Sequence, residues 1–345
     1  MQAPSFATRT YAWMTKSGCR RTRWRALRVG IALLALMLAP VRETGAQGAG
    51  FLLLPIGARS VGAGEAVIAD TLGVDGIWWN PASMASMGKS ELSINGSQTL
   101  EGNSAAIGFA RPSRVLGTIA AAANILDYGT QGVTDSAGVE GATSTVRSSI
   151  LMLSYATEIG QRLRVGLSYK YARLAFTCTG NVVFCGAESQ FVGASSAVDF
   201  GAQYVLPTHI PVTIGAAVRN LGPSFQVKDS EQADPLPRTW QAGLSSRVPI
   251  AALDTAGVTL DLMADLLGSL AYQGISARLG GSLTYQERYS LRAGYTLVEG
   301  ALGGAALGLG ARLSEGMAID IARRFDALAA QSGVSPTYVT LRFRF

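Results

Sequence analysis

Charged residues are scarce in this chain. Only 15% of its 345 residues are Asp, Glu, Lys or Arg, whereas 48% are hydrophobic; ordinary globular proteins contain about 25% charged residues. Beyond residue 50 the sequence also lacks any run of about 20 apolar residues, the length that a membrane-crossing helix needs. The low charge and the many Val, Ile, Leu and Tyr residues exclude a disordered chain. A hydrophobic chain without long hydrophobic runs indicates alternation of apolar and polar residues.

The net charge of +6 comes entirely from the first 46 residues. This segment holds eight Lys and Arg residues and one Glu, a net charge of +7, so the rest of the chain carries −1. A nucleic-acid-binding protein would carry its basic surface in the folded part. The charge distribution therefore excludes nucleic acid as a partner.

The first 46 residues have the pattern of a secretory signal peptide. A basic stretch, Arg20–Arg28, precedes the apolar stretch Val29–Val41, which is too short to span a bilayer comfortably. Small residues at positions 44–46 suit cleavage after Ala46. We predict that residues 1–46 are a signal peptide and that the mature chain lies outside the cytoplasm. A retained membrane anchor is the alternative.

Cysteine and histidine are also rare. After the leader only Cys178 and Cys185 remain, and an oxidising compartment favours a disulfide between them. A metal site would need more ligands nearby, and His209 is the only histidine. A P-loop ending at Gly88-Lys89-Ser90 would need glycine at position 83, where this chain has Ser83. No Gly-x-Ser-x-Gly elbow is present either. We predict no enzymatic activity, no metal and no cofactor.

Beyond residue 90, apolar and polar residues alternate with the period of a β-strand. At the C-terminus Val339, Leu341, Phe343 and Phe345 share one face, and Tyr289–Leu297 alternates in the same way. Such segments give about fourteen strands, most of them near the roughly 9–11 residues with which a tilted strand crosses a bilayer. The expected strands are roughly 90–98, 103–111, 114–124, 147–157, 161–174, 193–205, 210–220, 237–247, 255–264, 275–285, 288–297, 303–313, 316–324 and 337–345.

The connections between these strands alternate in length. Those after even-numbered strands have about two to seven residues, whereas those after odd-numbered strands reach about 22. Short periplasmic turns and longer external loops are typical of an outer-membrane barrel. Such a barrel must close, because lipid offers no hydrogen-bond partners to the backbone groups of a free sheet edge. We therefore predict an all-β protein whose residues 90–345 form a transmembrane antiparallel β-barrel in the outer membrane, with both termini periplasmic. A soluble periplasmic all-β protein is the alternative.

The two faces of these strands have different expected surroundings. The apolar face contacts outer-membrane lipid, and the face rich in small and polar residues lines the lumen. Charged residues on the inner face are expected to pair or to be solvated; they are Asp199, Asp261, Arg292, Arg312 and Asp320. Aromatic residues near strand ends, Tyr338 among them, are interpreted as a girdle at the membrane interface. The terminal Phe345 is interpreted as the signal that the barrel-assembly machinery, an expected partner, reads.

Residues 47–89 do not alternate like a spanning strand. Phe51–Pro55 precedes a Gly-rich stretch, a short helical candidate at Glu65–Ala69, and the sequence Trp78-Trp79-Asn80-Pro81. About forty residues are enough to fold into the mouth of a wide barrel. We predict that this segment forms a hatch in the lumen; a periplasmic arm packed under the barrel is the alternative.

The N-terminal segment also resembles a known family. The stretches FLLLPIGARSVGAGEAVIAD (residues 51–70) and IWWNPASMA (residues 77–85) resemble the signature of the PorV/PorQ family, within the FadL-like outer-membrane barrels. The signature contains the hatch residues Arg59, Trp78, Trp79, Asn80 and Pro81. Shorter matches follow in order at Val218–Gly222, Pro235–Arg238, Leu291–Tyr295, Gly308–Gly310 and Ile319–Asp320.

The resemblance implies a fourteen-stranded barrel with an N-terminal hatch, and two alternative functions. PorV-like proteins work with the type IX secretion system, receiving exported cargo proteins and passing them on for surface attachment. FadL-like proteins instead carry hydrophobic small molecules inward. The expected external loops are short for a FadL-type pocket, which favours the first function. Cargo proteins would then bind loops near residues 125–146, 175–192 and 221–236.

Overall fold

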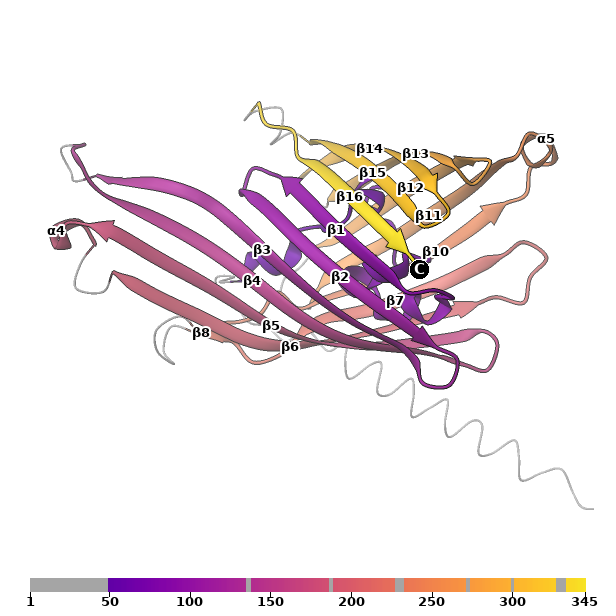
Figure 1. Ribbon diagram of the computed structural model, residues 1–345, viewed down its shortest axis with the longest axis horizontal. Coiled ribbons are helices and arrows are strands. Elements are labelled where there is room, and N and C mark those ends of the chain that lie inside the picture. The colour runs from indigo at the N-terminus through magenta and orange to yellow at the C-terminus, as the bar shows by residue number, and fades with distance from the viewer. Residues whose placement is uncertain are drawn as a thin grey trace, which may run out of the picture. The chain divides into compact units, whose positions relative to one another are not determined.

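The computed structural model describes residues 49–134, 138–185, 189–226, 233–270, 274–298, 301–326 and 333–345. The expected leader, residues 1–46, lies outside these ranges. Within them, a segment of short helical turns precedes a series of β-strands (Figure 1). The described part of the chain contains no helix that is long and apolar enough to cross a membrane.

Residues 49–89 are called the hatch from here on. Its helical turns are η1 (Gly50–Leu53), α2 (Ala58–Gly62), η2 (Gly73–Asp75), α3 (Gly76–Trp79) and η3 (Pro81–Ser86). The helix expected at Glu65–Ala69 is wrong, because these residues form turns and helix α2 lies just before them. Gly64 and Glu65 have φ angles of +64° and +61°, a left-handed conformation that ends a helix.

Fourteen antiparallel strands form a closed barrel, as predicted. Consecutive strands are paired, β7 pairs with β10, and the pairing of β1 with β16 closes the ring. The barrel strands are β1 (Glu91–Gln98), β2 (Asn103–Ser113), β3 (Gly117–Thr134), β4 (Glu140–Ile159), β5 (Leu163–Gly180), β6 (Gln190–Val205), β7 (Val212–Leu221), β10 (Thr239–Val248), β11 (Val258–Ser269), β12 (Ile275–Tyr285), β13 (Tyr289–Val298), β14 (Ala301–Ser314), β15 (Met317–Asp326) and β16 (Thr337–Arg344).

The barrel has two distinct ends. The turn end carries the short connections that follow β2, β4, β6, β12 and β14, the helix α5 (Ala251–Thr255) after β10, and the C-terminus. The loop end carries the other connections, with α4 (Val182–Cys185) at its tip. The even strand count places the start of β1 and the end of β16 together at the turn end. The hatch, however, begins near the loop end, where the Phe51 ring lies 6.0 Å from Phe225, in the connection after β7.

Outward and inward side chains alternate as the sequence indicates. On β5, Leu167, Tyr169 and Tyr171 are exposed, whereas Ser168 and Lys170 between them are buried. The exposed residues form an apolar outer face. The buried residues point into the lumen, toward the hatch.

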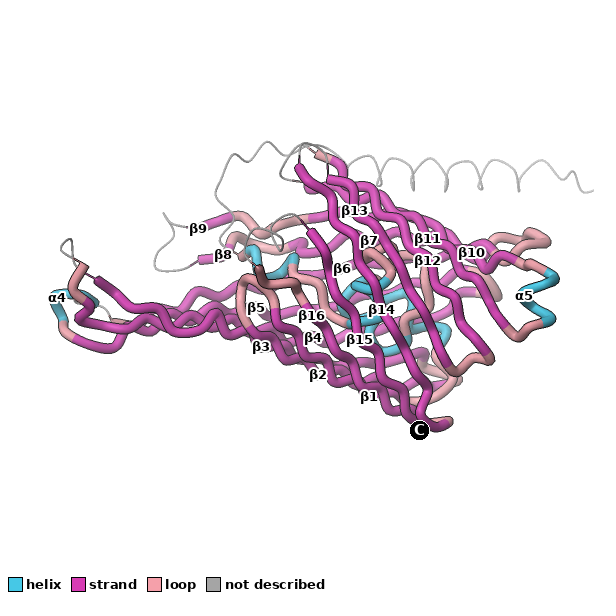
Figure 2. Tube along the Cα trace, turned by 90° about the horizontal axis from the view of Figure 1, so that it is seen from above, coloured by secondary structure: helices cyan, strands magenta, loops and turns pink. Residues whose placement is uncertain are grey.

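The hydrophobic core lies between the hatch and the barrel wall. Hatch residues such as Val67, Leu72 and Met84 pack with small wall residues such as Ala120 and Ala156. Figure 2 shows the helical turns of the hatch surrounded by the strands. Small inward side chains thus leave the lumen wide enough to hold the hatch. Tyr338 does not belong to an interfacial girdle, because it is 2% exposed and packs inside the barrel against hatch residues of α2.

Strands β3 to β6 have 16–20 residues and continue past their neighbours at the loop end (Figure 1). The last pair between β2 and β3 is Asn103 with Asp127, and beyond it β3 pairs only with β4. We call residues 128–134, 140–146, 175–180 and 190–193 the strand extension. The loop predicted at 125–146 is therefore wrong, because most of its residues are paired strand. In the loop predicted at 175–192, half of the residues are paired strand.

The pairing between β6 and β7 stops well before the loop end of β6. Above the pair Val198–Leu221, β6 stays paired with β5. On its other side it loses β7 and pairs only with the short strand β8 (Phe225–Gln226), which pairs with β9 (Ala233–Asp234). The third predicted loop, at 221–236, is the connection between β7 and β10, and its described part folds inward. Its Phe225 is fully buried, so the connection covers the loop end of the lumen.

Candidate functional site

The hatch divides the lumen into two cavities. The loop-side cavity has a volume of about 370 Å³ and the turn-side cavity a volume of about 360 Å³. Hatch residues Phe51–Leu54, Trp78 and Trp79 line the first, whereas Arg59 and Asp70 line the second. The hatch therefore forms the floor of one cavity and the roof of the other.

The loop-side cavity combines an apolar hatch floor with a wall of mixed apolar, polar and cationic residues. The barrel residues that line it are Ile150, Met152, Lys170, Arg219, Thr239, Leu267, Gly268, Ser269, Gly274, Ile275, Ser276, Arg278 and Val298. Mostly apolar pockets with a small number of polar groups are typical of small-molecule sites, because burial gives affinity and the polar groups fix orientation. This cavity is the candidate functional site.

The turn-side cavity is strongly charged and contains four of the five predicted lumen residues. Asp320 accepts hydrogen bonds from Arg292 Nη1 at 2.6 Å and from Arg342 Nη2 at 2.7 Å. Asp261 pairs with Arg247 Nε at 3.0 Å and not with Arg292. Arg312 lies at the open mouth, where its Nη1 is 3.4 Å from Glu287. These residues neutralise one another, so their arrangement is consistent with a structural role.

The fifth predicted lumen residue, Asp199, sits at a bulge in the wall. Arg219 and Asn220 of β7 face this single residue of β6, and Asn220 has a φ of +62°. Asp199 Oδ1 accepts from the backbone N–H of Asn220 at 2.8 Å, and its Oδ2 lies 2.7 Å from Lys170 Nζ. The bulge points Arg219 at the hatch, where its Nη1 donates to Trp78 O at 3.1 Å.

The residues of the N-terminal signature hold the hatch together. Asn80 Nδ2 donates to Ile68 O at 2.7 Å and to Ala202 O of β6 at 3.3 Å. Trp79 Nε1 donates to Ile56 O at 2.9 Å. Both tryptophans also face the loop-side cavity, so anchoring and ligand contact are compatible roles.

The remaining signature residues act within the hatch and against the wall. Arg59 Nη2 lies 2.9 Å from Asp70 Oδ2. Pro81 packs against Gly166 and Gly201, where an added Cβ would collide with the hatch backbone or with side chains at 80–81. The signature therefore specifies a segment fitted closely to the barrel.

Inward glycines let the hatch backbone approach the wall closely. A Cβ added to Gly308 of β14 would lie 2.9 Å from the Cα of Gly62. An added Cβ would collide with hatch atoms at six wall glycines, which are Gly166, Gly201, Gly215, Gly280, Gly294 and Gly308. Because they lie on six strands, the contact extends around much of the barrel.

Charged and polar wall residues that sequence reasoning missed fix the hatch in place. Glu65 lies 2.9 Å from Arg278 Nη2 and 3.0 Å from Arg324 Nη1. Asp265 Oδ2 accepts from the backbone N–H of Ile68 at 2.9 Å and from Gln241 Nε2 at 2.8 Å. Alternation already places Asp265 on the inner face, but no sequence signal identifies its partner in the hatch.

The hatch also bridges the closing strands β1 and β16. Thr340 Oγ1 accepts from the backbone N–H of Ala58 at 2.8 Å and donates to Asn95 Oδ1 at 2.6 Å. Glu91 accepts from Val74 N–H at 3.1 Å and pairs with Arg344 of β16. Phe345, predicted as the assembly signal, lies at this seam; it is 65% exposed and its ring stacks on Phe109.

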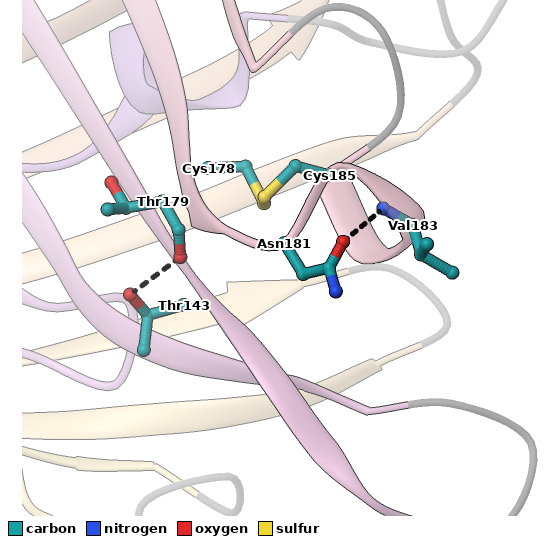
Figure 3. Close-up of a disulfide and its surroundings, with 6 residues drawn as sticks. All are labelled: Thr143, Cys178, Thr179, Asn181, Val183 and Cys185. Carbon is teal, nitrogen blue, oxygen red and sulfur yellow. Dashed lines mark hydrogen bonds between the residues drawn. A yellow bond between two sulfur atoms is a disulfide. The ribbon is translucent and has the colours of Figure 1, made fainter.

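A disulfide joins Cys178 of β5 to Cys185 at the end of α4, at the tip of the strand extension (Figure 3). Asn181 Oδ1 accepts from the backbone N–H of Val183 at 3.0 Å within the same turn. The disulfide is remote from both cavities. In the described part of the chain, no group of three His, Cys, Asp or Glu residues could hold a metal ion.

No protein-family profile and no characterised protein sequence matches the chain. Solved structures match its fold. The toluene transporter TbuX of Ralstonia pickettii is 14% identical, with 84% of this chain and 98% of that chain covered and a TM-score of 0.54. The CymD monoaromatic hydrocarbon channel is 12% identical, with 87% and 99% covered and a TM-score of 0.60.

A Pseudomonas aeruginosa FadL homologue is 13% identical, with 85% of this chain and 98% of that chain covered and a TM-score of 0.50. At such low identity the likeness concerns the fold alone. The chain thus has a FadL-like barrel fold. None of these matches distinguishes the PorV/PorQ type.

Proposed function

We propose that this protein is an outer-membrane channel for hydrophobic small molecules. The observation that carries the proposal is the loop-side cavity, a space with an apolar hatch floor inside a closed barrel. Its volume is about 370 Å³, whereas an apolar cavity of roughly 150 Å³ holds benzene. A molecule of one or two aromatic rings fits. The similar folds of TbuX and CymD, a toluene transporter and a monoaromatic hydrocarbon channel, support this class of ligand.

The outer face supports a membrane location. Large apolar side chains between 40% and 65% exposed surround the barrel, among them Ile119, Leu153, Leu279, Leu291 and Leu309. In water so much exposed apolar surface would drive aggregation. In our proposal the turn end and its short connections face the periplasm.

The alternative role as a secretion shuttle has less support. It depended on long external loops to receive cargo proteins, and paired strand takes up most of residues 125–146 and half of residues 175–192. Recovery of secreted proteins with gently extracted barrel, seen by native mass spectrometry, would favour the shuttle over the channel.

The channel is tested by filling its cavity. Leu267 of β11 lines the loop-side cavity, and its neighbour Leu266 is 50% exposed on the outer face. Leu267→Trp should reduce uptake of labelled toluene to the level of cells that lack the protein, because the indole occupies the cavity. Leu266→Trp, the matched control, should leave uptake unchanged. Equal uptake by both variants, or no uptake by the wild type, would contradict the proposal.

A further inference from the structure

The apolar outer face of β3, β4 and β5 ends at one level near the loop end. On β5, Tyr171 is the last large apolar outward residue and Arg173 is the next outward position. Arg173 lies ten residues beyond Leu163. At roughly 3.3 Å per residue and a tilt of roughly 40°, this is about 25 Å along the barrel axis, the height of a typical lipid-facing band. Arg173 therefore lies where the hydrocarbon region would end.

A second arginine lies beside it on the same face. Ser149 of β4 is the register partner of Arg173, and Arg147 is that of Ala175. Arg147 and Arg173 are therefore diagonal neighbours, with Cα atoms roughly 7–8 Å apart. Arg147 is 67% exposed and pairs with Asp127 of β3 at 2.8 Å. Arg173 is exposed and has no carboxylate partner among the described residues.

The outward side chains below these arginines are suited to acyl chains. On β4 they are Leu151 and Leu153, 57% and 63% exposed, and on β5 they are Tyr169 and Tyr171. Above them the next outward residue of β5 is the small Ala175, and the two outward positions after it, 177 and 179, are both Thr. One cationic group of net charge +1, formed by the two arginines and Asp127, thus lies directly above an apolar strip.

We propose that Arg147 and Arg173 bind the phosphate of a membrane lipid whose acyl chains lie along Leu151, Leu153 and Tyr171. Guanidinium groups bind phosphate through paired N–H donors. A soluble anion would leave the apolar strip unused, which is why a lipid is the expected occupant. The inference rests on the proposed membrane location and is independent of what the lumen carries.

The probe is lipid A, an acylated disaccharide with two phosphates, and its dephosphorylated form is the control ligand. Binding to the full-length protein in detergent is measured by native mass spectrometry. The wild type should bind lipid A in preference to the dephosphorylated form. Arg173→Gln should weaken lipid A binding about tenfold, the effect of losing one charge-assisted contact. Arg162→Gln, which removes an exposed arginine from the β4–β5 turn at the turn end, should not change it.

Asp127→Asn provides an independent test, because it frees Arg147 from its ion pair and should strengthen lipid A binding. Heat-modifiable migration on a gel shows that each variant is folded. A folded wild type that binds both ligand forms equally overturns the lipid site but not the membrane barrel. Equal binding by Arg173→Gln and Arg162→Gln also overturns it. Wild-type protein that migrates alike with and without boiling would instead count against the membrane barrel itself.

Discussion

Replacing Glu65 by Gln should release the hatch and leave the barrel folded. The carboxylate is 7% exposed and lies between Arg278 and Arg324, which belong to strands on different parts of the wall. Gln has nearly the same volume, so the change removes the charge without creating a cavity. The two guanidinium groups would then remain in the lumen without the carboxylate that they share.

The size of the effect follows from burial. Removing one partner of a buried ion pair costs about 3–5 kcal/mol. Because Arg324 is 27% exposed, water compensates for part of the loss, and we expect about 3 kcal/mol, roughly a 100-fold shift toward the released hatch. Glu287→Gln is the matched control: Glu287 is 81% exposed beside Arg312, and such a surface pair is worth about 0–1 kcal/mol.

Hydrogen–deuterium exchange measures the release directly. Backbone amides of residues 58–70 should exchange faster in Glu65→Gln than in the wild type, whereas amides of the barrel strands should keep their protection. Glu287→Gln should resemble the wild type throughout. If residues 58–70 stay equally protected in Glu65→Gln, the ion pair does not hold the hatch and the reasoning is refuted.

Two further predictions concern the hatch contact and the disulfide. Gly308→Ala should destabilise hatch docking by about 1–3 kcal/mol through overpacking against Gly62. The control Gly96→Ala, whose added Cβ meets nothing within 4 Å, should destabilise docking less. Equal amide exchange rates at residues 58–70 in the two variants would contradict this prediction. Cys178→Ser opens a short loop of sequence separation 7, which in the chain-entropy account is worth about 2.5 kcal/mol. Faster amide exchange at residues 181–185, with unchanged heat-modifiable migration, is the expected result.

The barrel could be predicted because lipid and lumen impose a period of two on the sequence. In Leu163–Tyr171 every second residue is apolar, and the structure gives the same alternation of exposed and buried side chains from Leu167 to Tyr171. The prediction failed where that constraint ends. At residues 127–134 both faces of β3 leave the lipid band, so the outward positions become Asp127, Gly129 and Gln131 and no longer differ from the inward ones. The sequence there reads as a loop although the strand continues.

The lumen contacts could be predicted only in part. Alternation places Asp320, Arg292 and Asp265 on inner faces, but it carries no information on which inner residues meet. Glu65 shows why: its partner Arg278 is 213 residues away, and only the closed barrel and the docked hatch bring the two together. The hatch signature indicated the segment, whereas its ion pairs and glycine contacts depend on three-dimensional packing.

The hydrogen bonds of Thr340 also determine the order in which the chain can assemble. Thr340 belongs to the last strand, whereas its partners Ala58 and Asn95 belong to the hatch and to the first strand. The contact with Ala58 spans 282 residues and the contact with Asn95 spans 245 residues. Both form only when β16 reaches β1, so chain-closure entropy makes them late. The lumen is also enclosed at that step, after which the hatch could enter only through an end. We therefore expect closure of the β1–β16 seam and docking of α2 to occur as one cooperative event.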